Sequence, residues 1–107
     1  MLKIFGAPSR YIQGAGALDT LGQYAALFGR RAALVIDRYV HGVLGPRIEA
    51  LCAEHGVALT PLIVDGDLTP KLIAQLRAQA SDAAIDMVVA VGGGKSLDAG
   101  KAVAKSA

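Results

Sequence analysis

Residues 88–98 read VVAVGGGKSLD, an apolar run that meets three glycines and is followed by a lysine and a serine. The run from residue 86 to 91 is apolar on both faces, which is typical of an interior strand of a parallel sheet. Glycine lacks a Cβ, so the backbone can turn sharply and an anion can approach its N–H groups. A helix that begins near Lys95 would add unpaired N–H donors and the positive end of its dipole. The stretch therefore predicts a strand, a tight anion-binding loop and a helix.

On both sides of this loop, strand-like and helix-like segments alternate. Strands are expected over residues 32–36, 57–64 and 86–91, and residues 3–13 are expected to hold one or two short extended pieces. Pro61 would break the hydrogen-bond ladder of its strand, so that strand should lie at a sheet edge or carry a bulge. Such alternation favours right-handed crossovers and a parallel sheet. We therefore predict an α/β fold, a Rossmann-like parallel sheet with flanking helices, in which ligands bind beyond the carboxyl ends of the strands.

Three further helices are expected before the glycine loop. The first lies over residues 18–28 and ends at Gly29 in a left-handed turn. The second starts at Pro46, which suits a first helical position, and stops at Gly56. Thr69 is the expected N-cap of the third helix, with a proline in its first turn. The buried faces of the last two should hold Ile48, Leu51, Cys52, Leu72, Leu76 and Ala80.

Composition excludes several classes of protein. The 107 residues suffice for one compact domain, and the net charge is only +2 with scattered basic residues. With three tyrosines, two phenylalanines and no tryptophan, a nucleic-acid-binding surface is not expected. No apolar run reaches the 18 residues of a membrane span, and the N-terminus lacks a signal-peptide pattern. A single cysteine, Cys52, is expected to be buried and reduced, so the protein is expected in the cytoplasm.

The glycine loop fits two common nucleotide motifs poorly. The Walker pattern G-x-x-x-x-G-K-[ST] matches at Gly94 and the two residues after it, but its opening glycine would fall on Val89 inside the strand. The dinucleotide pattern G-x-G-x-x-G has a near match at residues 14–19, where the last position is Asp19. Lys95 would oppose the helix dipole by about 0.3–1 kcal/mol, and a bound phosphate would reverse that penalty. An anion site is therefore favoured over a plain glycine turn.

A second candidate residue, Asp37, stands at the carboxyl end of the strand 32–36. A carboxylate there can accept hydrogen bonds from both ribose hydroxyls of an adenosine and would repel a 2′-phosphate, which favours NAD over NADP. Asp37 could equally cap the next turn or pair with the neighbouring Arg38. Because an arginine in this place can accommodate a 2′-phosphate, the choice between NAD and NADP stays open at this point.

Three segments together resemble a known family. They are APSRYIQGAGALDTLGQYAALFG (residues 7–29), LVIDRYV (34–40) and GGGKSLDAGKAVA (92–104), and they are similar to glycerol dehydrogenases of the iron-containing alcohol dehydrogenase superfamily. The resemblance implies an NAD-dependent oxidoreductase acting on glycerol or a similar small polyol. Carried over by position, the cofactor-binding residues would be Asp37, Gly92, Gly93, Gly94, Lys95 and Asp98. The acid would hold the adenosine ribose and the glycines the pyrophosphate; Asp98 could alternatively be an acid that only complements the start of the helix.

The resemblance also implies parts that this chain lacks. In the family, zinc or iron is held by an aspartate and histidines of a second, mostly helical domain. Here His41 and His55 stand in no ligand pattern, so neither a metal ligand nor a catalytic residue is expected. Residues 1–107 are therefore expected to form an incomplete NAD-binding domain, the N-terminal half of a two-domain, homo-oligomeric dehydrogenase, without turnover by itself.

Two other readings of the resemblance remain. The chain could be a stand-alone nucleotide-binding or regulatory module that never catalyses. It could also belong to a branch of the superfamily with another substrate or reaction, such as the glycerol-1-phosphate dehydrogenases or the 3-dehydroquinate synthases, which share the architecture and the triple-glycine loop.

Overall fold

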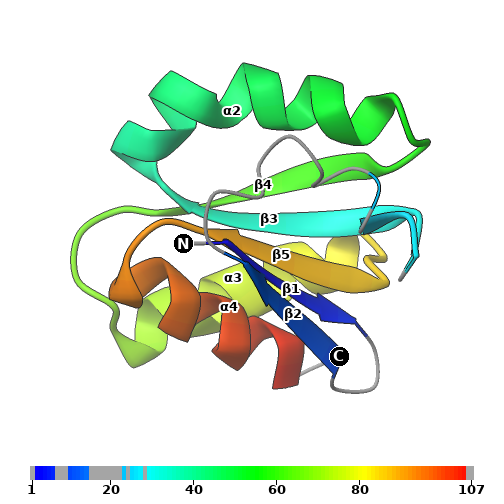
Figure 1. Ribbon diagram of the computed structural model, residues 1–107. Helices are drawn as coiled ribbons and strands as arrows, with labels where there is room; N and C mark the ends of the chain where they lie inside the picture. The colour runs from blue at the N-terminus through cyan, green and yellow to red at the C-terminus, as the bar shows by residue number, and fades with distance from the viewer. Residues whose placement is uncertain (1, 7–9, 15–22, 24, 28, 106–107) are drawn as a thin grey trace.

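The computed structural model describes residues 2–6, 10–14, 23, 25–27 and 29–105. It contains five strands, namely β1 (Leu2–Gly6), β2 (Arg10–Gly14), β3 (Arg31–Asp37), β4 (Ala58–Val64) and β5 (Met87–Val91). The described helices are α2 (Arg38–Ala53), α3 (Pro70–Asp82) and α4 (Gly94–Lys105). Figure 1 shows them in three layers, with α2 on one face of the sheet and α3 and α4 on the other.

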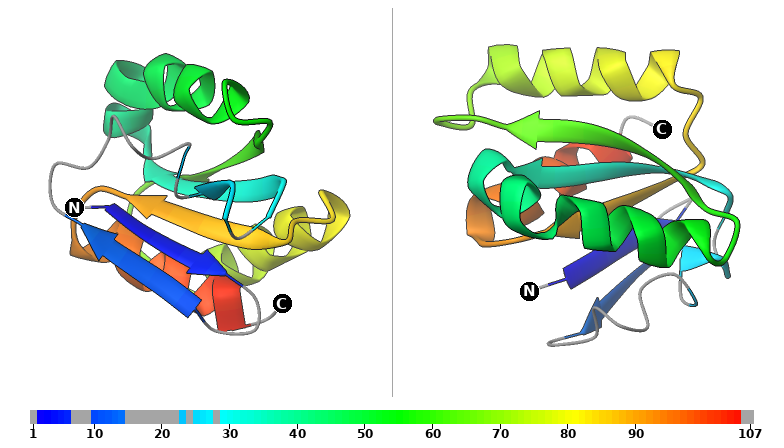
Figure 2. Two further views of the ribbon diagram at one scale, coloured as in Figure 1. Left: turned by 45° about the vertical axis from the view of Figure 1, so that its right-hand side comes forward. Right: turned by 90° about the horizontal axis from the view of Figure 1, so that it is seen from above.

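The strands form one sheet in the order β2-β1-β5-β3-β4. Strand β3 lies at the centre of a parallel trio and pairs with β4 on one side and β5 on the other. The predicted α/β arrangement, a Rossmann-like parallel sheet with flanking helices, is confirmed. The extended pieces expected over residues 3–13 are β1 and β2, which form an antiparallel hairpin that extends the sheet beyond β5 (Figure 2).

The apolar strands are buried on both faces, as their sequences predict. Alternate side chains of β3 and β5 point to opposite faces, so Leu34, Ile36 and Val89 join the core under α2, while Val35 and Val88 join the core under α3 and α4. All five residues of β5 are buried. This double coverage fixes the carboxyl ends of β3 and β5 side by side.

Strand β4 lies at the edge of the described sheet, as Pro61 predicts. Pro61 is opposite Leu34 in the parallel register and is exposed, and an edge strand tolerates a residue that lacks an N–H. The cap of the next helix is also confirmed, because Thr69 Oγ1 accepts a hydrogen bond from the Leu72 N–H at 3.1 Å. Leu76 is buried in α3, as its apolar stripe requires.

The expected start of the second helix is wrong. Helix α2 begins at Arg38, eight residues before Pro46, which lies within it. The reason is that Asp37 caps the helix directly at the end of β3, where its Oδ2 accepts the Val40 N–H at 3.1 Å. The expected end is near the observed one, since Gly56 adopts a left-handed conformation (φ +75°) just beyond α2.

The helix expected over residues 18–28 falls mostly outside the described residues, but its expected end at Gly29 can be tested. Gly29 is not in the left-handed region, so that expectation is wrong. A Cβ at this position would overlap the carboxylate of Asp86. Both oxygens of that carboxylate accept backbone N–H groups, from Arg30 and Arg31, at 3.0 Å each. Glycine is needed here because a side chain approaches closely, not because the chain turns.

The cysteine and the lengths of the helices bear on two expectations from composition. Cys52 is fully buried within the core under α2, as expected, and it is a free thiol. Burial raises its pKa from 9.0 to about 11. Among the residues that the structure describes, no helix is both long and apolar enough to span a bilayer.

Candidate functional site

The chain leaves the neighbouring strands β3 and β5 in opposite directions. After β3 it passes to α2 on one face, and after β5 it passes to α4 on the other, at the left of Figure 1. Such a divergence at the carboxyl ends of adjacent parallel strands opens a crevice, and ligands of open α/β sheets bind there. Asp37 and the glycine loop stand on the two sides of this crevice.

The three glycines play different parts. Gly92 has φ +129°, a backbone conformation that residues other than glycine rarely adopt. A Cβ there would lie 3.2 Å from Ser96 Oγ. At Gly93 and Gly94, by contrast, an added Cβ would have no atom of the described residues within 4 Å. The first glycine is thus required by the backbone, and the other two leave open space at the start of α4.

This open space fits an anion. Helix α4 begins at Gly94, and the N–H groups of its first turn have no partner within the helix because no preceding turn exists. The first bond of the helix runs from the Leu97 N–H to the Gly93 carbonyl at 3.1 Å. Amide donors, the positive end of the helix dipole and room for a group larger than a methyl therefore coincide, which suits a phosphate or diphosphate.

Asp37 is half-buried at the end of β3 and caps α2. The capping alternative considered from the sequence is therefore real. It does not exclude ribose binding, because a carboxylate offers about four acceptor sites and the described bond from Val40 occupies one of them. The cap also holds the carboxylate in one orientation at the crevice. Arg38 reaches away to the next strand, where its Nε donates to Asp65 Oδ2 at 3.0 Å.

Lys95 spans the carboxyl edge of the parallel trio. Its Nζ donates to the carbonyl oxygen of Gly66 at 2.9 Å and lies 3.8 Å from Asp67 Oδ1. These partners follow β4, whereas Lys95 follows β5, and β3 lies between the two strands in the sheet. The side chain is half exposed, so its ammonium remains within reach of an anion in the crevice.

Asp98 lies one turn further into α4 than expected. The first turn of the helix holds no acidic residue, so Asp98 does not stand at the start of the helix, as the alternative role given to it from the sequence requires. The dipole decays within the first turn, and this weakens the explanation that the acid only complements it. Residues four apart share a helix face, so exposed Asp98 lies on the same side as Gly94.

The turn after β4, residues 65–67, was missed by the sequence interpretation. It reads Asp-Gly-Asp and contacts both Arg38 and Lys95. The sequence did contain a signal for this turn. Polar residues that directly follow a parallel strand lie at the carboxyl edge of the sheet, and Asp37 was chosen as a candidate for that reason. The site therefore draws on the ends of all three parallel strands.

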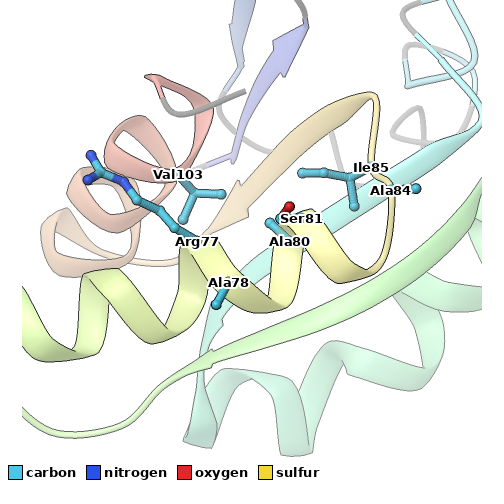
Figure 3. A pocket seen from close by; sticks show the side chains of 7 residues that line it. All are labelled: Arg77, Ala78, Ala80, Ser81, Ala84, Ile85 and Val103. Carbon is cyan, nitrogen blue, oxygen red and sulfur yellow. The ribbon is translucent and has the colours of Figure 1, made fainter.

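Neither a metal centre nor the described cavity adds to this site. No group of three histidines, cysteines or acids in the described part of the chain could hold a metal ion. A half-open cavity of about 480 Å³ lies near the amino end of β5, between the end of α3 and α4 (Figure 3). It is lined by Arg77, Ala78, Ala80, Ser81, Ala84, Ile85 and Val103. It is therefore at the edge of the sheet opposite to the glycine loop.

Comparison with known proteins adds independent information. The family model described as iron-containing alcohol dehydrogenase matches residues 8–107. The chain is 39% identical over 98 residues to a glycerol dehydrogenase of Thermotoga maritima, covering 91% of this chain and 26% of that protein. It is 32% identical over 104 residues to a glycerol dehydrogenase of Escherichia coli O6:H1 (97% and 28%). It is also 32% identical over 103 residues to a glycolaldehyde reductase of Halobacterium salinarum (96% and 28%). The chain thus spans about a quarter of the length of these relatives.

Proposed function

This chain belongs to the iron-containing alcohol dehydrogenase family, and from that premise we propose that it is the NAD-binding part of a metal-dependent polyol dehydrogenase. The proposed substrate is glycerol or a similar small alcohol, because several relatives are named glycerol dehydrogenases. The observation that carries the proposal is the pair of features that flank the position between the ends of β3 and β5 where ligands of open α/β sheets bind. Open space over amide donors lies on one side of it, and an oriented carboxylate lies on the other.

In this proposal, different residues bind different parts of NAD. The N–H groups at the start of α4 bind the diphosphate over Gly93 and Gly94. Asp37 accepts hydrogen bonds from the adenosine ribose, and Lys95 and Asp98 stand at the rim. NAD, when bound, supplies the acceptor for the hydride that leaves the alcohol. The part of this chain is to bind the dinucleotide and to fix its direction along the carboxyl edge of the sheet.

The described residues do not fit a metal site, so no step through a metal is assigned to them. In this proposal the zinc or iron, its ligands and the groups that touch the alcohol belong to other parts of a larger, homo-oligomeric enzyme. The relative named glycolaldehyde reductase extends the proposed substrates to two-carbon hydroxy compounds. Substrate choice is then made outside the cofactor crevice.

Calorimetric titration of NAD into the purified protein tests the proposal. Asp37→Asn retains an N-capping side chain but loses the charge, whereas Asp37→Ala loses both. We expect both variants to bind NAD about tenfold more weakly, because a charge-assisted hydrogen bond to the ribose is lost. Only Asp37→Ala should also lose about 1 kcal/mol of folding stability.

Thr69→Ala is the matched control, since it removes the corresponding cap of α3. It should lower stability by about 1 kcal/mol while leaving the NAD affinity within twofold of the original. Unchanged NAD binding in both Asp37 variants would remove the assigned role of that acid. A protein that binds no NAD at all would overturn the proposed function as a whole.

A further inference from the structure

The ion pair between Arg38 and Asp65 joins the ends of β3 and β4, beside the crevice. We infer that Asp65 is a specificity-determining residue, which withholds the Arg38 guanidinium from a 2′-phosphate and so makes the site select NAD over NADP. This inference rests on the proposed function and names the feature that sets its cofactor preference.

The position of Arg38 makes it the natural ligand for a 2′-phosphate. It directly follows Asp37, the residue assigned to the adenosine ribose, and an arginine near that acid is the feature that accommodates NADP in dinucleotide sites. Here the Arg38 Nε donates to Asp65 Oδ2 at 3.0 Å. The guanidinium is therefore already paired with a carboxylate at the neighbouring strand end.

The order of the strands places Asp65 beyond the ribose. The glycine loop follows β5, Asp37 ends β3 and Asp65 follows β4, and these strands are successive neighbours about 4.8 Å apart. A dinucleotide with its diphosphate at β5 and its ribose at β3 thus points its adenosine end toward β4. A 2′-phosphate there would meet the negative charge of Asp65, and Asp67 adds a second carboxylate in the same turn.

The turn that carries Asp65 is also held by Lys95 from α4. Lys95 Nζ donates to the Gly66 carbonyl at 2.9 Å, and Gly66 takes the left-handed conformation (φ +79°) that this tight turn uses. Asp65 is therefore kept near Arg38 by the same lysine that stands at the diphosphate end of the crevice. The two ends of the cofactor site are linked through residues 65–67.

The pair is suited to selectivity more than to stability. The side chain of Arg38 is 69% exposed and that of Asp65 is 62% exposed, and ion pairs so exposed contribute little to folding. Removing the pair should leave the protein folded. Its effect should therefore be visible in the ratio of the two cofactor affinities.

The test measures dissociation constants for NAD and NADP by calorimetry at one ionic strength. Asp65→Asn keeps the size of the side chain and removes its charge, so the ion pair with Arg38 is lost. We expect NADP to bind about tenfold more tightly, which corresponds to about 1.4 kcal/mol, with NAD within twofold of the original. Arg38→Gln in the Asp65→Asn background should abolish the gain for NADP.

Asp82→Asn is the matched control, because it removes the same charge from the exposed end of α3, far from the crevice. It should change neither affinity by more than twofold. Unchanged NADP binding in Asp65→Asn, with NAD bound as before, would overturn the inference and leave the proposed function standing. A gain for NADP that persists in the double variant would overturn the role of Arg38. Absence of NAD binding in the unmodified protein would overturn the proposed function and this inference with it.

Discussion

Replacing Gly92 and Gly93 by alanine, one at a time, distinguishes two reasons for a glycine. One is a backbone conformation that only glycine adopts easily, and the other is space for a ligand. Gly92 has φ +129°, and an alanine held there is strained by about 1–3 kcal/mol. Its Cβ would also lie 3.2 Å from Ser96 Oγ, and Ser96 is only 2% exposed, so it has little freedom to move away. We expect Gly92→Ala to lose about 2 kcal/mol of stability.

Gly93→Ala should behave in the opposite way. Its φ is not in the positive region and an added Cβ meets no described atom within 4 Å, so no strain arises. Alanine restricts the unfolded chain, which should raise stability by about 0.4–1 kcal/mol. The two variants should therefore differ by about 3 kcal/mol, or roughly 15 °C in melting temperature followed by circular dichroism.

The effect of Gly93→Ala on NAD affinity should be opposite to its effect on stability. The methyl group of Gly93→Ala would occupy the space proposed for the diphosphate at the amides of α4, so NAD affinity should fall by at least about tenfold although the protein is more stable. Two results would refute this reasoning. Equal melting temperatures for the variants would mean that Gly92 is not strained, and normal NAD affinity in Gly93→Ala would mean that the diphosphate does not lie there.

Two further predictions concern α2. Pro46 lies inside the helix, is exposed, and lacks the N–H that would donate to the Gly42 carbonyl. Pro46→Ala should therefore raise the free energy of unfolding in urea by about 1–2 kcal/mol. An unchanged urea midpoint would contradict this prediction. The pKa of Cys52 is about 11 in the folded protein, so above pH 9.0 the thiol ionises in the unfolded chain first and stability should fall as the pH rises to about 11. The loss of folding stability should not exceed about 3 kcal/mol. Urea unfolding of the original protein and of Cys52→Ala over this pH range measures it, and the loss should be absent from the variant.

The sequence was sufficient for the parts of the fold that depend on local patterns. The three parallel strands lie within one residue of their expected bounds, and Thr69 caps α3 as its spacing predicts. Both rest on local signals, namely a short apolar run along a strand and a cap three residues before its donor. Pro61 marked the edge strand because the missing N–H constrains any sheet.

The two misinterpreted residues have different explanations, one non-local and one local. Gly29 looks like the end of a helix, but it is glycine because Asp86, from a distant part of the chain, fills the space beside it. Pro46 looks like the start of a helix, but a capping acid at position 37 starts the helix earlier. In both cases a general preference of the residue was overruled by a specific contact. The Asp86 contact depends on the pairing of β5 with β3, which the local pattern does not determine, whereas the Asp37 cap lies only three residues from its donor.

The candidate site shows the same division. Its two sides, Asp37 and the glycine loop, were proposed because strand ends are visible in the sequence. The preference between NAD and NADP stayed open, since Arg38 adjoins Asp37 in sequence and its direction was unknown. The partner that gives it direction, Asp65, lies 27 residues away and becomes a neighbour only because β4 pairs with β3. If cofactor choice depends on this pair, then it is encoded in the pairing of strands, and the identity of either residue alone is insufficient to predict it.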